Sequence, residues 1–175
     1  MSQTVVQASL TVLAPVREGE LEQLKEVVAR IPRGADSPFA RVASTHFARF
    51  VIVPSLLDGD GEPIGQRSYL LFTADFDGAR ERWIKEIAAR SADELDGALG
   101  HCDGYPGSAD AVAFRAYLDR HDVGVGFSVI SYTATVERIH RSLERQHELR
   151  ALAARASALS PGELQDEWRS RLAAG

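Results

Sequence analysis

The chain has one cysteine in 175 residues and fewer basic than acidic residues, and both shortages exclude classes of protein. Cys102 cannot form an internal disulfide, which agrees with a reducing compartment. Lysine and arginine together number 20 against 25 aspartates and glutamates, so the net charge is -5 and no basic field is available for phosphates. We therefore expect no nucleic-acid partner.

The sequence also lacks a membrane segment and the familiar catalytic motifs. No apolar run approaches the ~20 residues that a transmembrane helix needs, and residues 1–16 lack the basic start and apolar run of a secretory leader. We expect a cytoplasmic protein with no membrane partner. No GxSxG or HExxH motif is present, and the "GVG" of residues 124–126 precedes a predicted strand, whereas a dinucleotide fingerprint follows one. No motif names a reaction.

Hydrophobic residues make up 45% of the chain, which is enough for one compact unit with a sizeable core. Alternating apolar residues between turn formers predict strands, and apolar residues at helical spacing predict helices. Asp77 and Ser108 are predicted helix N-caps, Ser91 can divide a helix in two, and Ser160 with Glu163 forms a capping box. The predicted strands are 9–16, 45–57, 67–78 and 125–136, and the predicted helices are 18–32, 79–100, 108–122, 137–159 and a last one from 160.

This order of elements predicts an α+β, ferredoxin-like βαββαβ fold, in which four antiparallel strands carry extra helices and a C-terminal helical extension. We expect the ferredoxin-like domain to span residues 1–135 and the extension, packed on the same domain, to span 136–175. The strands are apolar on both sides, so the sheet face away from the helices must also be covered. A second copy of the chain is the expected cover, which predicts a homodimer.

With this order, the chain resembles the dimeric α+β barrel superfamily. The segments "THFARFVIV", "YLLFTADFDG" and "GHCDGYP" look like parts of uncharacterised or peroxidase-like bacterial proteins. The resemblance implies a small-molecule enzyme of the monooxygenase, cyclase or peroxidase kind. It leaves the cofactor open: cofactor-free members use a few polar groups in an apolar cavity, whereas haem members carry an axial histidine, for which His121, His140 and His147 are available.

Strand alternation indicates which side chains face a ligand. On the third predicted strand, Leu70, Phe72, Ala74 and Phe76 suit helix packing, so Tyr69, Thr73 and Asp75 should point away from the helices. Arg49 either pairs with Asp75 as a structural ion pair or binds an anion. His46 either acts as an acid, a base or a metal ligand, or is a hydrogen-bonded residue in the wall of the cavity. The expected catalytic residues are His46, Arg49 and Asp75, and the expected substrate-binding residues are Tyr69, Thr73, His101 and Tyr105.

The loop "GHCDGYPGS" gathers His101, Cys102, Asp103 and Tyr105 between two predicted helices. No CxxC or HxxxH completes a zinc site, so no metal is predicted. Cys102 would be a nucleophile only if a neighbour such as His101 lowered its pKa. We interpret the loop first as a helix connector and second as a rim of the pocket.

Two classes of function therefore stay open. The first is a small-molecule enzyme, of oxidoreductase type by resemblance. The alternative is a non-catalytic ligand-binding domain or an assembly module that accompanies a larger enzyme.

Overall fold

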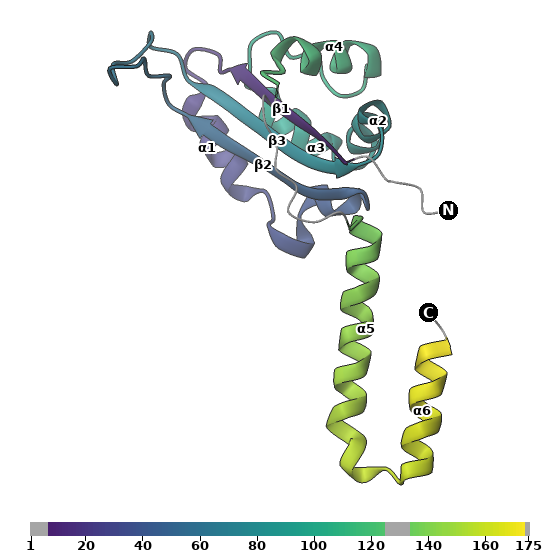
Figure 1. Ribbon diagram of the computed structural model, residues 1–175. Helices are drawn as coiled ribbons and strands as arrows, with labels where there is room; N and C mark the ends of the chain where they lie inside the picture. The colour runs from purple at the N-terminus through teal and green to yellow at the C-terminus, as the bar shows by residue number, and fades with distance from the viewer. Residues whose placement is uncertain (1–6, 125–133, 174–175) are drawn as a thin grey trace. The chain divides into compact units, whose positions relative to one another are not determined.

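The computed structural model describes residues 7–124 and 134–173, and the chain divides into two compact units, Met1–Thr133 and Ala134–Gly175 (Figure 1). The first unit contains a sheet with helices and the second is a helical hairpin. Each unit is described by itself below.

The sheet of the first unit has three strands in the order β1-β3-β2, and both pairs are antiparallel. Its strands are β1 (Gln7–Pro15), β2 (Thr45–Val53) and β3 (Tyr69–Asp77). β2 and β3 are joined by the long hairpin loop that the turn formers predicted, in which the Asp58 carboxylate accepts hydrogen bonds from the Asp60 and Glu62 amides at 2.9 Å.

The predicted four-stranded ferredoxin-like fold is wrong, because the described residues form a mixed α/β unit with a three-stranded sheet. Most of the predicted fourth strand falls on residues 125–133, which lie outside the described residues. Its last residue, Val136, begins a helix, with Thr135 as the N-cap. The error has a physical reason, since alternating apolar residues indicate a pleated segment but specify no pairing partner. Just before these residues, Asp122 forms an isolated antiparallel bridge with Val12 of β1, and the Val123 amide donates a 2.9 Å hydrogen bond to the Thr11 carbonyl.

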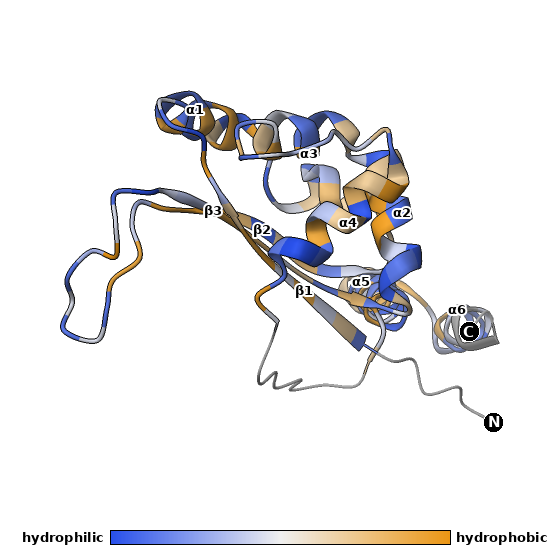
Figure 2. Cartoon of the chain, turned by 90° about the horizontal axis from the view of Figure 1, so that it is seen from above, coloured by the Kyte–Doolittle hydropathy of each residue, from blue (hydrophilic) through white to orange (hydrophobic). Residues whose placement is uncertain are grey.

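One face of the sheet forms the floor of the core. On β3, Leu70, Phe72, Ala74 and Phe76 are at most 2% exposed, which confirms the predicted helix-facing side of this strand. Leu10, Val12 and Ala14 of β1 extend the same face, and Ala48, Phe50 and Ile52 of β2 are partly buried beside it. The four α-helices found among the described residues of this unit lie over this face (Figure 2). They are α1 (Leu21–Arg30), α2 (Arg80–Arg90), α3 (Ala92–Leu99) and α4 (Ala111–His121).

Ser91 separates α2 from α3, as predicted. Its side chain is buried, and its hydroxyl donates a 2.9 Å hydrogen bond to the Pro38 carbonyl. This bond joins the helices to the two short 3₁₀ helices that precede β2, η1 (Gly34–Asp36) and η2 (Pro38–Arg41). Two predicted caps are wrong. The N-cap of α2 is Ala79, since the Asp77 carboxylate contacts His46 instead, and the N-cap of α4 is Asp110, whose carboxylate accepts from two amides of the first turn.

Aromatic rings fill the space between sheet and helices. Trp83 of α2 stacks on Phe76 with ring centroids 4.3 Å apart, and Phe72 contacts Phe50, with centroids 4.8 Å apart. The indole nitrogen of Trp83 donates a 2.9 Å hydrogen bond to the Thr45 hydroxyl, so this buried ring keeps a polar partner. Phe39 of η2 packs edge-on against Phe50 and thereby places η2 against β2.

We expect Phe72→Ala to lower the free energy of unfolding by about 3–5 kcal/mol, because it empties the centre of a packed core. Val112 is 81% exposed on α4, so Val112→Ala should change stability by less than ~0.5 kcal/mol. Urea denaturation followed by tryptophan fluorescence measures both. Equal effects of the two substitutions would contradict the assignment of the core.

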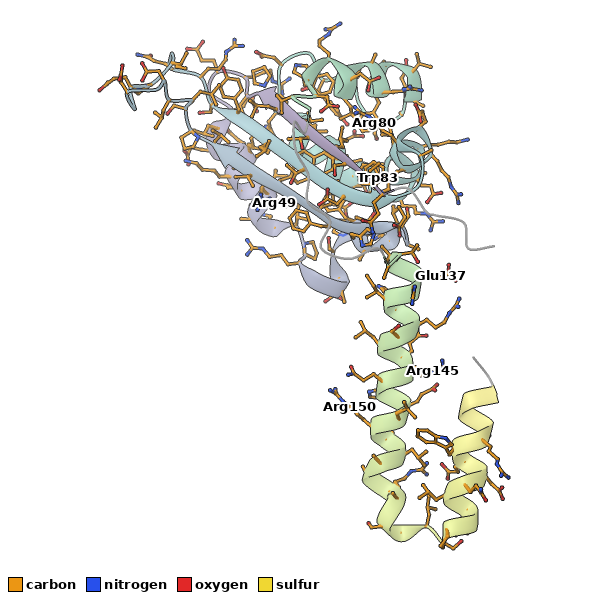
Figure 3. All side chains as sticks on the ribbon, in the orientation of Figure 1. Arg49, Arg80, Trp83, Glu137, Arg145 and Arg150 are labelled. Atoms are coloured by element: carbon orange, nitrogen blue, oxygen red, sulfur yellow. The ribbon has the colours of Figure 1, made fainter. Side chains whose placement is uncertain are left out.

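The second unit is a hairpin of α5 (Val136–Arg155) and α6 (Pro161–Ala173), joined through η3 (Ala156–Ala158) (Figure 3). The predicted capping box is confirmed, since Ser160 and Glu163 exchange hydrogen bonds at the start of α6. Arg155 and Glu167 pair across the hairpin at 2.8 Å. An apolar hollow of about 630 Å³ lies between the helices. No helix within residues 7–124 and 134–173 has both the length and the apolar content needed to cross a membrane.

Candidate functional site

The "GHCDGYPGS" loop connects α3 to α4 and is fastened to α3 by one carboxylate. Asp96 accepts hydrogen bonds from the Tyr105 hydroxyl at 2.6 Å and from the Ser108 amide at 2.8 Å, and the Ser108 hydroxyl donates a third at 3.0 Å. Gly100 ends α3 at a place where a Cβ atom would collide with the Asp96 carbonyl oxygen. The loop is therefore a helix connector, as predicted.

The same loop also contacts the start of α1 and the end of β1. The His101 ring nitrogen Nδ1 lies 2.6 Å from the Glu20 carboxylate at the start of α1, and Arg17 donates to the Gly100 carbonyl. The Asp103 amide donates a 2.9 Å hydrogen bond to the carbonyl of Pro15. The two predicted substrate-binding residues of this loop, His101 and Tyr105, thus contact protein groups that hold the loop in place.

Cys102 is completely buried in the core, and burial raises the pKa of its thiol to about 12. A thiol with this pKa stays protonated at neutral pH, whereas a nucleophile needs the thiolate. His101 does not lower the pKa, since its side chain pairs with Glu20. The structure gives no support to the hypothesis of a reactive cysteine.

The raised pKa predicts a loss of stability in alkali. The ordinary pKa of the thiol is 9.0, and its pKa in the folded protein is about 12. The contribution of the protonated thiol to the stability of the folded state is therefore complete below pH 9 and is lost as the pH rises from 9 to 12. Burial also raises the pKa values of the Tyr105 and Tyr117 phenols, which adds to the same trend. The urea concentration at the midpoint of unfolding should therefore be lower at pH 10.5 than at pH 8. This decrease should be smaller in Cys102→Ala. Equal declines in the two proteins would contradict this assignment.

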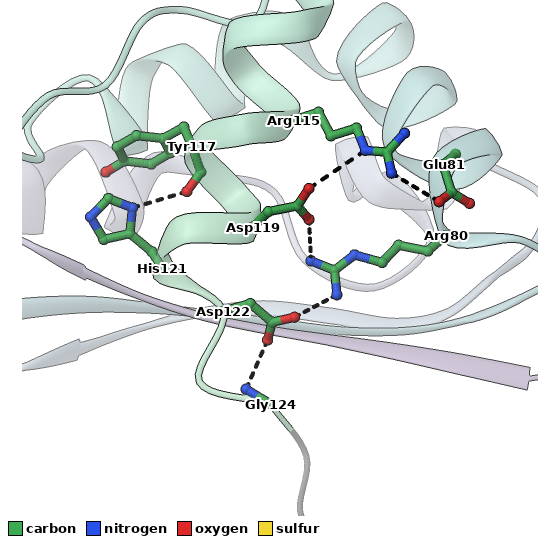
Figure 4. Close-up of polar contacts among 8 residues, drawn as sticks. All are labelled: Arg80, Glu81, Arg115, Tyr117, Asp119, His121, Asp122 and Gly124. Atoms are coloured by element: carbon green, nitrogen blue, oxygen red, sulfur yellow. Dashed lines mark hydrogen bonds and ion pairs between the residues drawn. The ribbon is translucent and has the colours of Figure 1, made fainter.

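A network of charges joins α2 to α4 (Figure 4). Arg80 pairs with Asp119 at 2.9 Å and also with Asp122, while Arg115 pairs with Glu81 at 3.0 Å. Burial alone would raise the pKa of Asp122, but the hydrogen bonds from Arg80 and Gly124 outweigh burial and lower it. The charged side chains drawn in this network contact one another, which indicates a structural role.

His46 lies at the start of β2, beside a bulge between Thr45 and Phe47. Its Nε2 atom lies 2.9 Å from the Asp77 carboxylate, and the Gln7 side-chain amide lies 3.2 Å from the same nitrogen. The His46 and Asp77 side chains are only 10% and 11% exposed. His46 is therefore a largely buried residue that is hydrogen-bonded to its neighbours at one end of the sheet. Over the part of the chain that the structure describes, no three His, Cys, Asp or Glu side chains are grouped to hold a metal ion.

The predicted ion pair between Arg49 and Asp75 does not form. Their strands place Arg49 opposite Thr73 and Asp75 opposite Phe47, and the Asp75 carboxylate accepts a 2.6 Å hydrogen bond from the Ser9 hydroxyl of β1. The Arg49 guanidinium instead lies 5.4 Å from the centre of the Phe47 ring. Thr73, Asp75 and Tyr69 all lie on the sheet face away from the helices, as predicted, but they do not line a hollow with Arg49.

A hollow of about 310 Å³ lies between the end of α1 and strand β2. Arg33 and Arg49 are both exposed and line it, and neither forms an ion pair with a described residue. Gly34 has a φ of +69°, a conformation that suits glycine, and it turns the chain at the rim of the hollow. We call this hollow the Arg33–Arg49 pocket. Its lining residues are Val28, Ile31, Pro32, Arg33, Gly34, Ser37, Phe39, Ala48, Arg49 and Phe50.

Of the seven residues predicted for a site, Arg49 alone is among those that line the Arg33–Arg49 pocket. His46, Asp75, Tyr69, Thr73, His101 and Tyr105 are distributed over the end of the sheet, its other face and the helix connector. Sequence reasoning missed Arg33, which stands in a loop between Pro32 and Gly34. A single arginine in a loop carries no periodic signal, and an absent ionic partner is visible only in three dimensions.

Comparison of the chain with protein-family models, with curated proteins and with solved structures finds no match in any of the three.

Proposed function

We propose that the chain binds an anionic ligand with a small apolar body in the Arg33–Arg49 pocket. The observation that carries this proposal is the pair of arginines beside an apolar wall, without an ionic partner among the described residues. Arg80 and Arg115 of the first unit pair with carboxylates. Arg90 and Arg120 likewise form no ion pair with a described residue, but they are not among the lining residues of the pocket. A guanidinium presents a rigid fork of donors that matches a carboxylate or phosphate oxygen pair.

The rest of the lining supports the same class of ligand. Val28, Ile31, Phe39 and Phe50 provide apolar surface, and the Ser37 hydroxyl adds one polar group. A volume of about 310 Å³ lies at the small end of the range for ligand sites, which is about 300–1,000 Å³. Apolar contact would hold the body of the ligand, and the arginines would orient its charged end.

The lining favours binding over catalysis. Among the described residues that form it, no histidine, cysteine, aspartate or glutamate is present to move a proton or attack a substrate. His46 is not a lining residue and is hydrogen-bonded to Asp77. We therefore propose the ligand-binding alternative, and the oxidoreductase expected from the resemblance stays a prediction.

We expect phenylacetate to bind the full chain and phenylacetamide, its neutral counterpart of the same shape, to bind at least tenfold more weakly. Arg49→Ala and Arg33→Ala should each weaken phenylacetate binding about tenfold, because each removes a charge-assisted hydrogen bond. Arg49→Lys should retain part of the affinity, since lysine keeps the positive charge but lacks the planar set of guanidinium N–H donors. Isothermal titration calorimetry measures the affinity of the unmodified chain for both ligands and of the three variants for phenylacetate.

Arg120→Ala is the matched control, because it removes one positive charge from α4 at a position that is not among the lining residues. This variant should bind phenylacetate as the unmodified chain does. Equal binding of the acid and the amide, or an equal loss in all three alanine variants, would refute an anion site at this pocket.

A further inference from the structure

Among the residues that the structure describes, strand β2 is paired along only one of its two edges. It is the last strand of the sheet and hydrogen-bonds to β3 on one side only. On the other side, no described residue pairs with the backbone between Phe47 and Val53. A strand edge of this kind presents a row of free amides and carbonyls that can accept a further strand.

The Arg33–Arg49 pocket lies along this free edge. Ala48, Arg49 and Phe50 line the pocket and belong to the unpaired stretch of β2, while Val28 of α1 and Ile31, the residue after α1, form the opposite wall. The pocket is therefore a groove between a helix end and an edge strand. Ala48 and Phe50 face the groove from the helix side of the sheet, whereas Arg49, opposite Thr73, leaves β2 on the other face of the same edge. A ligand in this groove can contact apolar side chains and the free backbone at the same time.

The features that border the edge limit what can pair with it. A bulge between Thr45 and Phe47 closes one end, and Pro54 follows the last residue at the other. A second copy of β2, paired antiparallel around Arg49, would place the two Arg49 side chains directly opposite each other, where like charges repel. A segment that carries a negative charge complements both Arg49 and Arg33.

We propose that the ligand is the carboxy-terminal segment of a polypeptide, which adds to the free edge of β2 as a further strand and places its terminal carboxylate between Arg33 and Arg49. This inference rests on the proposed function, since it requires the anion site. Backbone hydrogen bonds along β2 would provide affinity, and alternate side chains of the segment would enter the apolar groove.

The test uses the full chain and three peptide probes in calorimetry. The first is acetyl-Thr-Val-Thr-Val-Leu with a free carboxylate, the second is its C-terminal amide, and the third is acetyl-leucine, which keeps the carboxylate but has almost no backbone. We expect the pentapeptide acid to bind at least tenfold more tightly than acetyl-leucine. Amidation of the pentapeptide and the Arg49→Ala substitution should each weaken its binding affinity about tenfold. The Arg120→Ala substitution should leave the affinity unchanged.

Two further pentapeptides carry N-methyl groups on alternate amides, one on the odd set and one on the even set. A strand directs alternate amides to its neighbour. One N-methylated set should therefore abolish the gain over acetyl-leucine, and the other set should leave it intact. Hydrogen exchange should slow at alternate amides between Phe47 and Val53 when the unmodified peptide binds.

Failure of this inference is distinguishable from failure of the anion site. If acetyl-leucine and the pentapeptide bind equally, and both depend on Arg49, the strand addition is refuted and the anion site stands. If the peptide amide binds as tightly as the peptide acid, or if neither peptide acid binds while phenylacetate does, the peptide proposal is refuted and the anion site stands. If phenylacetate also fails to bind, both proposals are refuted. If both N-methylated sets lose affinity equally, the ligand does not add as a strand.

Discussion

The architecture of the first unit depends on the burial of one face of β3, the central strand. Because β3 pairs on both sides, Phe72 and Phe76 have fixed positions, and Trp83 of α2 stacks on this aromatic floor. Helix burial on this face also determines where the chain between α1 and β2 must pass. Phe39 packs against Phe50 at the strand edge, so the turn that carries Arg33 stays beside β2. The proposed binding pocket is a consequence of this packing.

The histidine, cysteine and tyrosine of the helix connector differ from the two arginines of the pocket in one physical respect. His101 pairs with Glu20, Tyr105 bonds to Asp96, and Cys102 is buried as a neutral thiol. Their polar groups are thus used within the fold or kept uncharged by it. Arg33 and Arg49 are charged, and neither has an ionic partner among the described residues. Residue type made the loop a candidate rim of the pocket, second to its role as a helix connector, whereas the absence of ionic partners among the described residues draws attention to the two arginines.

Local rules predicted the parts of the fold that depend on local chemistry. The alternation of β3, the break at Ser91 and the capping box at Ser160 each follow from a few neighbouring residues, and the structure confirms all three. The four-stranded fold and the Arg49–Asp75 pair were wrong because both depend on registers between distant segments. In the observed register, Asp75 lies next to Ser9 of β1, and no pattern within one strand indicates that neighbour.

In the proposed site, Arg33 and Arg49 together bind the charged group of one ligand. The most direct measurement is the nuclear magnetic resonance of the arginine Nε–Hε groups in ¹⁵N-labelled full chain during titration with phenylacetate. We expect the Arg33 and Arg49 signals to shift together along one saturation curve, and the backbone amide signals of Ala48 and Phe50 to follow the same curve. Signals of both arginines that stay unchanged while phenylacetate is added, or that change no more than the signal of Arg120, would contradict this site.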